Sequence, residues 1–385
     1  MGVDNIITTI DDIKSNVESD DFDLMIKYAD DLVEELIVLE KKIQSKLHFV
    51  QTLLTDMDRY IKTKIKTTSI EIKEDIKTLS DLIHVANKYG TPQQDMDSPI
   101  NTKILYDLIN PLQELNKIIG MTDIKNQIVD QILTSMQFLY DGDISFHTVI
   151  TGPPGVGKTM LAKSLAEIYL KMGLLKNEKF VFKIAKRSDL IGKYLGHTSI
   201  KTQEFIDNCE GGVMFIDEVY SLGSQDKKDN FSKECIDTLN LNLTEKKNFI
   251  CIIAGYPNEI EDCFFSFNEG LKRRFPFRYD IQNYTSNELS QIFAKKIMDC
   301  NWKMDFEISK LEKFIDNNKD NFKYFGGDID NLILNCKTVH SRRIFGKDRS
   351  LMKILTYDDI VNGYNKMMLF KINKESKPTY SYMYS

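Results

Sequence analysis

Residues 151–160, TGPPGVGKTM, have the composition and spacing of a phosphate-binding loop. Glycines allow backbone N–H groups to curl around phosphate oxygens, and the N-terminus of a following helix adds its positive dipole end. An apolar run precedes this loop and an amphipathic stretch follows it, as such a site requires. Lys158 is placed to reach the β- and γ-phosphates, and the Thr159 hydroxyl to bind Mg²⁺. The predicted ATP-binding loop comprises Gly152, Pro153, Pro154, Gly155, Val156, Gly157, Lys158, Thr159 and Met160.

A second motif, GGVMFIDEVYSL at residues 211–222, places two carboxylates at the end of an apolar run. A lone Asp-Glu pair at a strand end is usually a solvated turn. Here it follows the phosphate-binding loop with one further apolar run between them, which favours a shared site. Asp217 is then predicted to hold Mg²⁺, and Glu218 to orient and deprotonate the water that attacks the γ-phosphate.

Short apolar runs alternate with helical stretches from about residue 119 to residue 283, which predicts a parallel β-sheet covered on both faces. The runs are HTVIT, KFVFKIAK, GGVMFIDE, FICIIAG and FRYDI. Beyond residue 284, four helical segments without a strand predict a small all-α domain. The tail, residues 373–385, is predicted to be frayed.

The first part of the chain is predicted to be helical. Ten of twelve heptad-spaced positions from Met25 to Lys64 are apolar, which indicates one long helix with a hydrophobic seam. A second helical stretch, residues 69–90, ends at Gly90 and Pro92, and residues 90–99 have the composition of a linker. A helical hairpin and a partner-binding coiled coil both fit this region. The predicted domains are 1–98, 99–283 and 284–372, followed by the tail.

The composition excludes some classes of protein. The net charge of −6 argues against binding driven by nucleic-acid phosphates. The six cysteines are scattered without a C-x-x-C pair, which is typical of reduced thiols. Because no run approaches the length of a membrane span and the first residues lack the features of a secretion signal, we expect a soluble, cytoplasmic protein.

From Leu115 to about Lys371, the chain resembles the AAA+ ATPases, most of all the clade of red-type rubisco activase (CbbX/CfxQ) and stage V sporulation protein K. The resemblance rests on IIGMTDIKNQI, the phosphate-binding loop, DLIGKYLGHTSIKT, GGVMFIDEVYSL, IIAGYPNEIEDCFFSFNEGLKRRFPF and GGDIDNLI. It implies a parallel sheet of order 5-1-4-3-2, a C-terminal α-helical lid, and assembly into a homo-oligomeric ring, by expectation a hexamer.

The resemblance also implies roles for single residues. Ile119 and Gly120 would line the adenine pocket, and Tyr256 would occupy a sensor position beside the γ-phosphate. Arg274 would be the arginine finger that completes a neighbouring subunit's site, with Arg273 as the competing candidate. The lid departs from many AAA+ proteins: GGD at residues 326–328 stands where a sensor arginine is common.

The stretch GKYLGHT at residues 192–198 falls where AAA+ rings carry a loop that lines the central channel. Its aromatic-hydrophobic-glycine triplet is Tyr194, Leu195 and Gly196. An aromatic side chain can grip an extended peptide by non-directional contact, whatever its sequence. A minor packing contact is the alternative for this tyrosine. A second loop, residues 223–234, is either a channel lining or a solvated charge run.

These observations predict an Mg²⁺-dependent ATPase that remodels a client polypeptide through aromatic channel loops. The alternative is a nucleotide-controlled scaffold whose functional surface is the N-terminal coiled coil. A nucleic-acid motor is disfavoured by the net charge and by the aromatic channel loop. The sequence does not identify the client.

Overall fold

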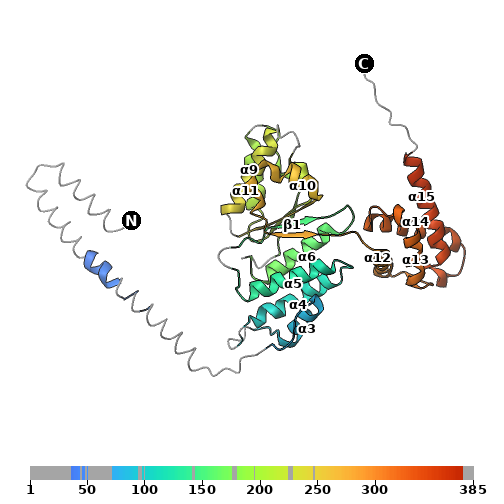
Figure 1. Cartoon of the computed structure of the whole chain (residues 1–385), viewed down its shortest axis with the longest axis horizontal. Coiled ribbons are helices and arrows are strands. Elements are labelled where there is room, and N and C mark those ends of the chain that lie inside the picture. The colour runs from blue at the N-terminus through green and yellow to red at the C-terminus, as the bar shows by residue number, and fades with distance from the viewer. Residues whose placement is uncertain are drawn as a thin grey trace, which may run out of the picture. The chain divides into compact units, whose positions relative to one another are not determined.

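The computed structural model divides the chain into two compact units, Met1–Ile70 and Glu71–Ser385 (Figure 1). It describes residues 36–43, 46–47, 50, 72–93, 98, 100–140, 144–175, 180–194, 196–223, 229–245 and 248–375.

In the first unit, residues 36–43, 46, 47 and 50 are helical. At least half of each of the apolar side chains Val38, Leu39, Ile43, Leu47 and Val50 is exposed. The rest of the predicted heptad seam lies outside the described residues, so the coiled coil stays a prediction.

The second unit is built on a five-stranded parallel sheet of order β2-β3-β4-β1-β5. This is the predicted order 5-1-4-3-2 read from the other edge. The strands are β1 (Thr148–Thr151), β2 (Phe182–Ala185), β3 (Val213–Ile216), β4 (Ile250–Gly255) and β5 (Phe277–Asp280), and each falls in a predicted apolar run. β3 and β4 are buried along their whole length, which explains why they are almost entirely apolar.

Helices cover both faces of this sheet (Figure 1). Successive strand residues point to opposite faces, so Val149 and Ile150 belong to different hydrophobic clusters. On one face lie α3 (Leu79–Tyr89), α4 (Thr102–Asn116), α5 (Thr122–Met136) and α6 (Lys158–Lys171). The other cluster packs against α7 (Arg187–Leu190), α8 (His197–Asp207), η1 (Val219–Leu222), α9 (Asn230–Glu245), α10 (Pro257–Cys263), η2 (Phe265–Phe267) and α11 (Glu269–Lys272).

Helix α3 is part of the nucleotide-binding unit, which differs from the predicted boundary at residues 98/99. Its buried Leu82 belongs to the main core, and the Thr91 hydroxyl donates to the Thr102 hydroxyl at 2.9 Å. Gly90 and Thr91 are bonded to the two packed helices, since the Gly90 N–H donates to the Ala86 carbonyl and the Thr91 N–H to the Thr102 carbonyl, although their composition also suits a linker. The helix starts at Leu79, later than predicted. Thr78 and Asp81 form a capping box at this end, in which each side chain accepts a hydrogen bond from the other residue's backbone N–H.

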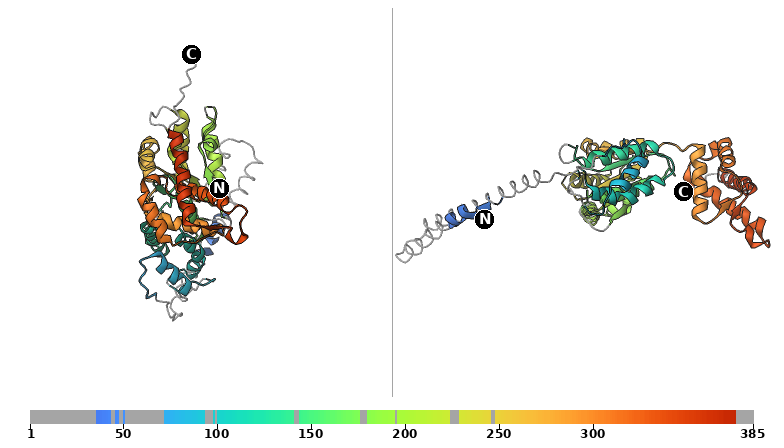
Figure 2. Two further views of the ribbon diagram at one scale, coloured as in Figure 1. Left: turned by 90° about the vertical axis from the view of Figure 1, so that its right-hand side faces the viewer. Right: turned by 90° about the horizontal axis from the view of Figure 1, so that it is seen from below.

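The lid consists of α12 (Ser286–Asp299), α13 (Ile308–Asn317), α14 (Gly326–Ile344) and α15 (Tyr357–Glu375) (Figure 2). The four predicted helices are therefore present. The prediction that the lid has no strand is wrong, because β6 (Lys303–Met304) pairs in parallel with β7 (Ile354–Leu355). Two 3₁₀ turns, η3 (Lys319–Asn321) and η4 (Arg349–Leu351), complete the lid. Two-residue strands are too short to leave a periodic pattern in the sequence.

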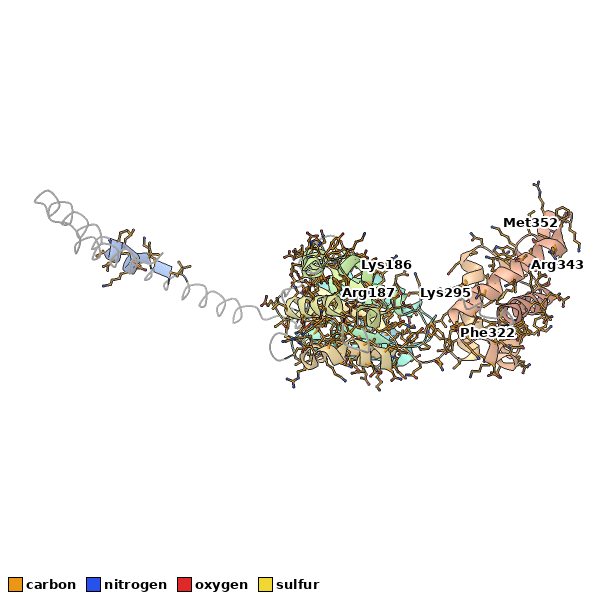
Figure 3. The ribbon with its side chains drawn as sticks, turned by 90° about the horizontal axis from the view of Figure 1, so that it is seen from above. Lys186, Arg187, Lys295, Phe322, Arg343 and Met352 are labelled. Carbon is orange, nitrogen blue, oxygen red and sulfur yellow. The ribbon has the colours of Figure 1, made fainter. Side chains whose placement is uncertain are left out.

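A buried carboxylate joins α14 to α15 inside the lid. Asp359 is 1% exposed and accepts hydrogen bonds from Arg343 Nη2 at 2.8 Å and from the Thr356 backbone N–H at 3.0 Å. Its Oδ2 also lies 3.1 Å from His340 Nδ1. Burial alone would raise the pKa of Asp359, but hydrogen bonds from Arg343, Thr356 and His340 hold it below its usual value. Arg343 is therefore held within the lid (Figure 3).

Asp359→Asn is expected to lower the free energy of unfolding at neutral pH by about 1.5–3 kcal/mol, the range for a hydrogen bond to a charged group. A carboxyl group with a lowered folded pKa stabilises the protein above its unfolded pKa, and this contribution is lost as the pH falls through the folded pKa. Chemical denaturation of the full chain at pH 7 measures the change in the free energy of unfolding. Asp358→Asn is the matched control, because that neighbouring carboxylate is exposed. Equal effects of the two variants would contradict the role given to Asp359.

Candidate functional site

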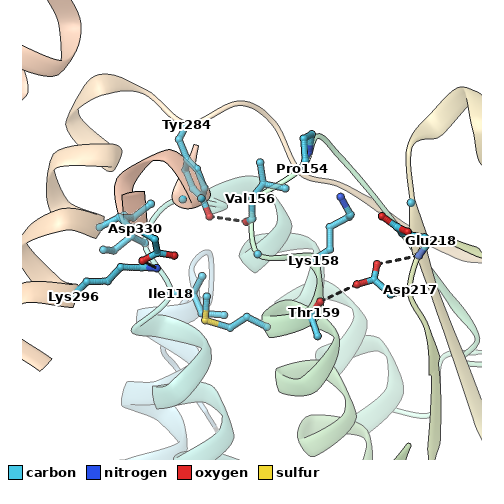
Figure 4. A pocket seen from close by; sticks show the side chains of 18 of the residues that line it. Ile118, Pro154, Val156, Lys158, Thr159, Asp217, Glu218, Tyr284, Lys296 and Asp330 are labelled. Atoms are coloured by element: carbon cyan, nitrogen blue, oxygen red, sulfur yellow. Dashed lines mark hydrogen bonds and ion pairs between the residues drawn. The ribbon is translucent and has the colours of Figure 1, made fainter. Parts of the chain in front are cut away.

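A cavity of about 620 Å³ lies at the carboxyl ends of β1, β3 and β4 (Figure 4). This is the edge of a parallel α/β sheet where ligands usually bind, and the volume suits a nucleotide. The lining residues from the α/β part are Ile118, Ile119, Pro154, Gly155, Val156, Gly157, Lys158, Thr159, Met160, Asp217, Glu218, Tyr220, Gly255, Tyr256 and Tyr284. Helices α12 and α14 of the lid supply Ile292, Lys295, Lys296, Asp299, Gly326, Gly327 and Asp330.

The phosphate-binding loop has the expected backbone. Gly155 and Gly157 have φ values of +77° and +92°, which glycine adopts without strain, and α6 begins directly behind them at Lys158. Gly152 and Pro153 are not among the lining residues, but their carbonyl oxygens each accept a hydrogen bond from Lys158 Nζ at 2.9 Å. Burial lowers the pKa of Lys158, while the charges on Asp217 and Glu218 oppose that shift.

The two motifs predicted to share a site do meet. Thr159 Oγ1 donates to Asp217 Oδ2 at 3.3 Å, and the Glu218 backbone N–H donates to Asp217 Oδ1 at 3.0 Å. No group of three or more His, Cys, Asp or Glu side chains able to hold a metal ion occurs in the described ranges. One carboxylate and one hydroxyl nevertheless fit Mg²⁺, which keeps several waters and takes further ligands from nucleotide phosphates.

Two tyrosines line the acidic end of the cavity, the end that contains Asp217 and Glu218. The Tyr256 ring has Lys158 Nζ 5.3 Å from its centroid, so the predicted sensor residue does lie beside the phosphate-binding loop. Tyr220 stacks on Tyr256 with ring centroids 5.6 Å apart. Tyr220 was not among the predicted site residues. Its position two residues after Glu218 in DEVY was the available signal.

The other end of the cavity contains one of the two residues predicted for adenine. Ile119 lines it together with Ile118. Gly120 is not among the lining residues; it has a φ of +72°, and a Cβ there would lie 2.5 Å from Glu288 Oε1. The Tyr284 hydroxyl, which the sequence analysis missed, donates to the Val156 carbonyl at 2.8 Å.

The lid presents lysines to the cavity but no arginine among the residues that line it. Lys296 Nζ lies 2.6 Å from Asp330 Oδ1, and Lys295 Nζ donates to the Lys117 carbonyl at 2.6 Å. Arg343, one of the two arginines further along α14, is bound to Asp359 instead. The sequence predicts a lid without the usual sensor arginine, and the lining of the cavity agrees with that prediction.

The lid also contacts the phosphate-binding loop through its main chain. The Gly326 backbone N–H donates to the Gly155 carbonyl at 3.1 Å. A Cβ on Gly155 would lie 2.1 Å from the Tyr324 carbonyl oxygen, so only glycine fits this contact. The Asp328 carboxylate accepts a hydrogen bond from the Tyr324 backbone N–H at 2.8 Å and so fixes the turn into α14. The GGD sequence thus builds a close lid–loop junction.

Arg274 does not line the cavity of its own chain. It lies with Arg273 at a second cavity of about 440 Å³ that also contains His147, at the opposite, amino end of β1. Burial, and then the charge on Arg274, lowers the pKa of His147 to about 4. The Arg274 Nε is buried and, within the described part of the chain, has no hydrogen-bond partner. Arg273 is exposed.

The predicted channel loop presents its tyrosine to solvent. The Tyr194 side chain is 68% exposed and makes an edge-on contact with His197, with ring centroids 5.5 Å apart. Gly196 has a φ of +81° and precedes α8. Leu195 and most of the predicted second loop, residues 224–228, lie outside the described residues.

Arg187 connects the bases of the two predicted channel loops (Figure 3). It comes from α7, just before the Tyr194 loop, and Arg187 Nη2 lies 2.8 Å from Asp229 Oδ2. Its Nη1 donates to the Ser221 carbonyl and to the Ser232 hydroxyl. These partners flank residues 224–228 on both sides.

A phosphate-binding loop facing an Asp-Glu pair on this sheet order, beneath a helical lid, defines a P-loop ATPase of the AAA+ class. The family model for the ATPase family associated with various cellular activities (AAA) matches residues 148–282. A putative cfxQ-like protein of Acanthamoeba polyphaga mimivirus is 45% identical over 305 residues, which are 77% of this chain and 73% of that protein. The chain therefore belongs to the CfxQ-like branch of the AAA ATPases, and it hydrolyses ATP with Mg²⁺.

Two further relatives support this family assignment. A CfxQ homolog of Pyropia yezoensis is 31% identical over 280 residues, 69% of this chain and 91% of that protein. Stage V sporulation protein K of Bacillus subtilis is 37% identical over 195 residues, 49% of this chain and 59% of that protein. Among the described helices, none has the length and apolar character needed to cross a membrane.

Proposed function

We propose that this ATPase remodels a client polypeptide by pulling on it with Tyr194 and its loop. The observation that carries the proposal is the exposure of this large aromatic side chain two residues before Gly196, whose φ is positive. An exposed ring grips extended peptides without regard to sequence. The Arg187 bonds support the proposal, because they join the loop to the segment that follows the catalytic carboxylates.

The chemistry is assigned to the residues at the carboxyl ends of β1 and β3. Lys158 leaves the Gly152 and Pro153 carbonyls to bind the β- and γ-phosphates. Thr159 and Asp217 hold Mg²⁺, which neutralises charge that develops on the phosphates. Glu218 orients the attacking water and accepts its proton.

The position of Arg274 supports an active site completed by a second copy of the chain. It lies at the end of the sheet away from its own cavity, and its Nε has no hydrogen-bond partner among the described residues. In a ring, this guanidinium would reach the neighbour's nucleotide and neutralise charge on the transferred phosphoryl group. We therefore propose a homo-oligomer, with a hexamer as the expected size.

A scaffold function is the second candidate. The exposed apolar side chains between residues 38 and 50 favour it, because such a helix face can bind another helix. In that case nucleotide would control assembly and the N-terminal helices would be the working surface. In the remodelling proposal, the same helices select the client or anchor the ring.

Tyr194→Ala separates the two functions. We expect this variant to lose the increase in ATP turnover that an unstructured probe polypeptide, casein, produces in the unaltered protein. The measurement is phosphate release with and without casein. Tyr106→Ala is the control, because Tyr106 is an exposed tyrosine on α4, outside the proposed channel loop. A Tyr194→Ala protein that casein stimulates fully would contradict the proposed role of Tyr194, and an unaltered protein that casein does not stimulate would favour the scaffold.

A further inference from the structure

Tyr220 and Tyr256 form a stacked pair at the acidic end of the nucleotide cavity. Tyr256 directly follows β4, and Tyr220 lies in η1, just after β3. Their ring centroids are 5.6 Å apart and the ring planes differ by 18°. Stacked aromatic pairs are favourable beyond the area that they bury. The pair thus joins the carboxyl ends of two adjacent strands.

This tyrosine pair lies between the lysine and the glutamate that the reaction needs. On one side, Lys158 Nζ is 5.3 Å from the Tyr256 ring centroid, within the distance for a cation–π interaction. On the other side, Tyr220 and Glu218 both line the cavity and lie two residues apart in the turn after β3. Burial is the main cause that raises the pKa of Tyr220 to about 12, and the charge on the nearby Glu218 adds to it. The hydroxyl is therefore protonated and able to donate at neutral pH.

The backbone next to the two tyrosines leaves room for the Tyr220 ring and holds the main chain of Glu218 in an unusual conformation. Gly255 leaves room for the Tyr220 ring, because a Cβ at Gly255 would come within 2.9 Å of Tyr220 Cδ1. Glu218 has a φ of +50° and a ψ of +47°, a left-handed conformation that is unusual for glutamate. Its carbonyl accepts a hydrogen bond from the Ser221 backbone N–H at 2.7 Å. The turn thus fixes the main chain of Glu218, but its exposed side chain needs a separate restraint.

We propose that Tyr220 is a positioning residue for ATP hydrolysis: its hydroxyl orients the Glu218 carboxylate, and its stacking on Tyr256 links that orientation to Lys158. The proposal rests on the role proposed above for Glu218. When Lys158 moves from the Gly152 and Pro153 carbonyls to phosphate, the cation over Tyr256 moves as well. The stacked rings carry that change to Tyr220 and so to the carboxylate that activates water.

Tyr220→Phe tests the proposal, because it keeps the ring and removes only the hydroxyl. We expect kcat for ATP to fall about tenfold, the lower end of the effect of outer hydrogen-bond partners in metal sites. Binding of a fluorescent ATP analogue should change less than twofold. Tyr89→Phe is the matched control, since the Tyr89 hydroxyl donates to Glu74 at 2.9 Å on α3, away from the cavity. A Tyr220→Phe enzyme with kcat within twofold of the unaltered protein would overturn the proposal.

Two further variants keep the proposal testable if Tyr220→Phe folds poorly. Gly255→Ala should displace the Tyr220 ring and lower kcat to a similar extent, and unchanged turnover would argue against the stack. In a Glu218→Asp protein, whose shorter side chain should not reach the hydroxyl, Tyr220→Phe should have no additional effect. Losses that multiply in the double variant would show that Tyr220 acts independently of Glu218.

Glu218→Gln separates this proposal from the one on which it rests. If Glu218→Gln keeps its turnover, the proposed role of Glu218 is wrong. If Glu218→Gln abolishes turnover and Tyr220→Phe has no effect, only the positioning role of Tyr220 is wrong.

Discussion

Arg274→Ala should reduce ATP turnover by about a thousandfold or more, the contribution of an arginine that stabilises phosphoryl transfer. The physical reason is the loss of a positive charge next to the developing negative charge in a site with little water. Nucleotide binding should remain, because Arg274 does not line the cavity of its own chain. Phosphate release and binding of a fluorescent ATP analogue measure the two effects.

Arg273→Ala is the matched control for this prediction. Arg273 is the adjacent arginine and is exposed, so we expect turnover within about twofold of the unaltered protein. Equal losses from both substitutions would instead point to a general requirement for positive charge on this surface.

Glu218→Gln is the second large expected effect. Turnover should fall at least about a hundredfold, the contribution of a positioned general base. ATP binding should persist, because an amide retains the size of the carboxylate while it cannot accept the proton. Glu259→Gln is a suitable control, since this exposed glutamate lies on α10 and does not line the cavity. A Glu218→Gln protein that still turns over ATP would require another base.

Mixing the two inactive proteins tests whether the site is shared between subunits. The Arg274→Ala chain retains Glu218, and the Glu218→Gln chain retains Arg274. In a mixed assembly, some sites would therefore contain both groups, and turnover should return. A mixture as inactive as its components would contradict an active site completed by a neighbouring subunit. Turnover per subunit of the unaltered protein should also rise with protein concentration.

Much of the nucleotide-binding unit could be predicted because its signals are local. Each of the five strands falls in one of the five predicted runs, and the phosphate-binding loop needs glycines directly before Lys158 and Thr159. The meeting of Thr159 with Asp217 follows from the sheet order, because β1 and β3 both border β4 and all three end at the same edge.

The parts that could not be predicted depend on contacts between distant segments. Lys295, Lys296 and Asp330 reach the cavity only because the lid folds back toward the phosphate-binding loop, and nothing in their local sequence indicates this. The predicted boundary separates helix α3 from the unit to which it belongs, because a connection between packed helices and a linker between domains share the same residue types. Tyr220 was missed since a tyrosine after an apolar strand is usually a packing residue.

The junction between the lid and the phosphate-binding loop includes a hydrogen bond between two neutral peptide groups, Gly326 N–H and Gly155 C=O. Dissolved ions screen a guanidinium that faces phosphate, but they have little effect on an uncharged pair. This contact between the lid and the loop should therefore persist at ionic strengths that weaken a contact between an arginine and phosphate. Since no side chain takes part, alanine scanning of side chains would not remove this bond. Proline at position 326, which has no N–H, would.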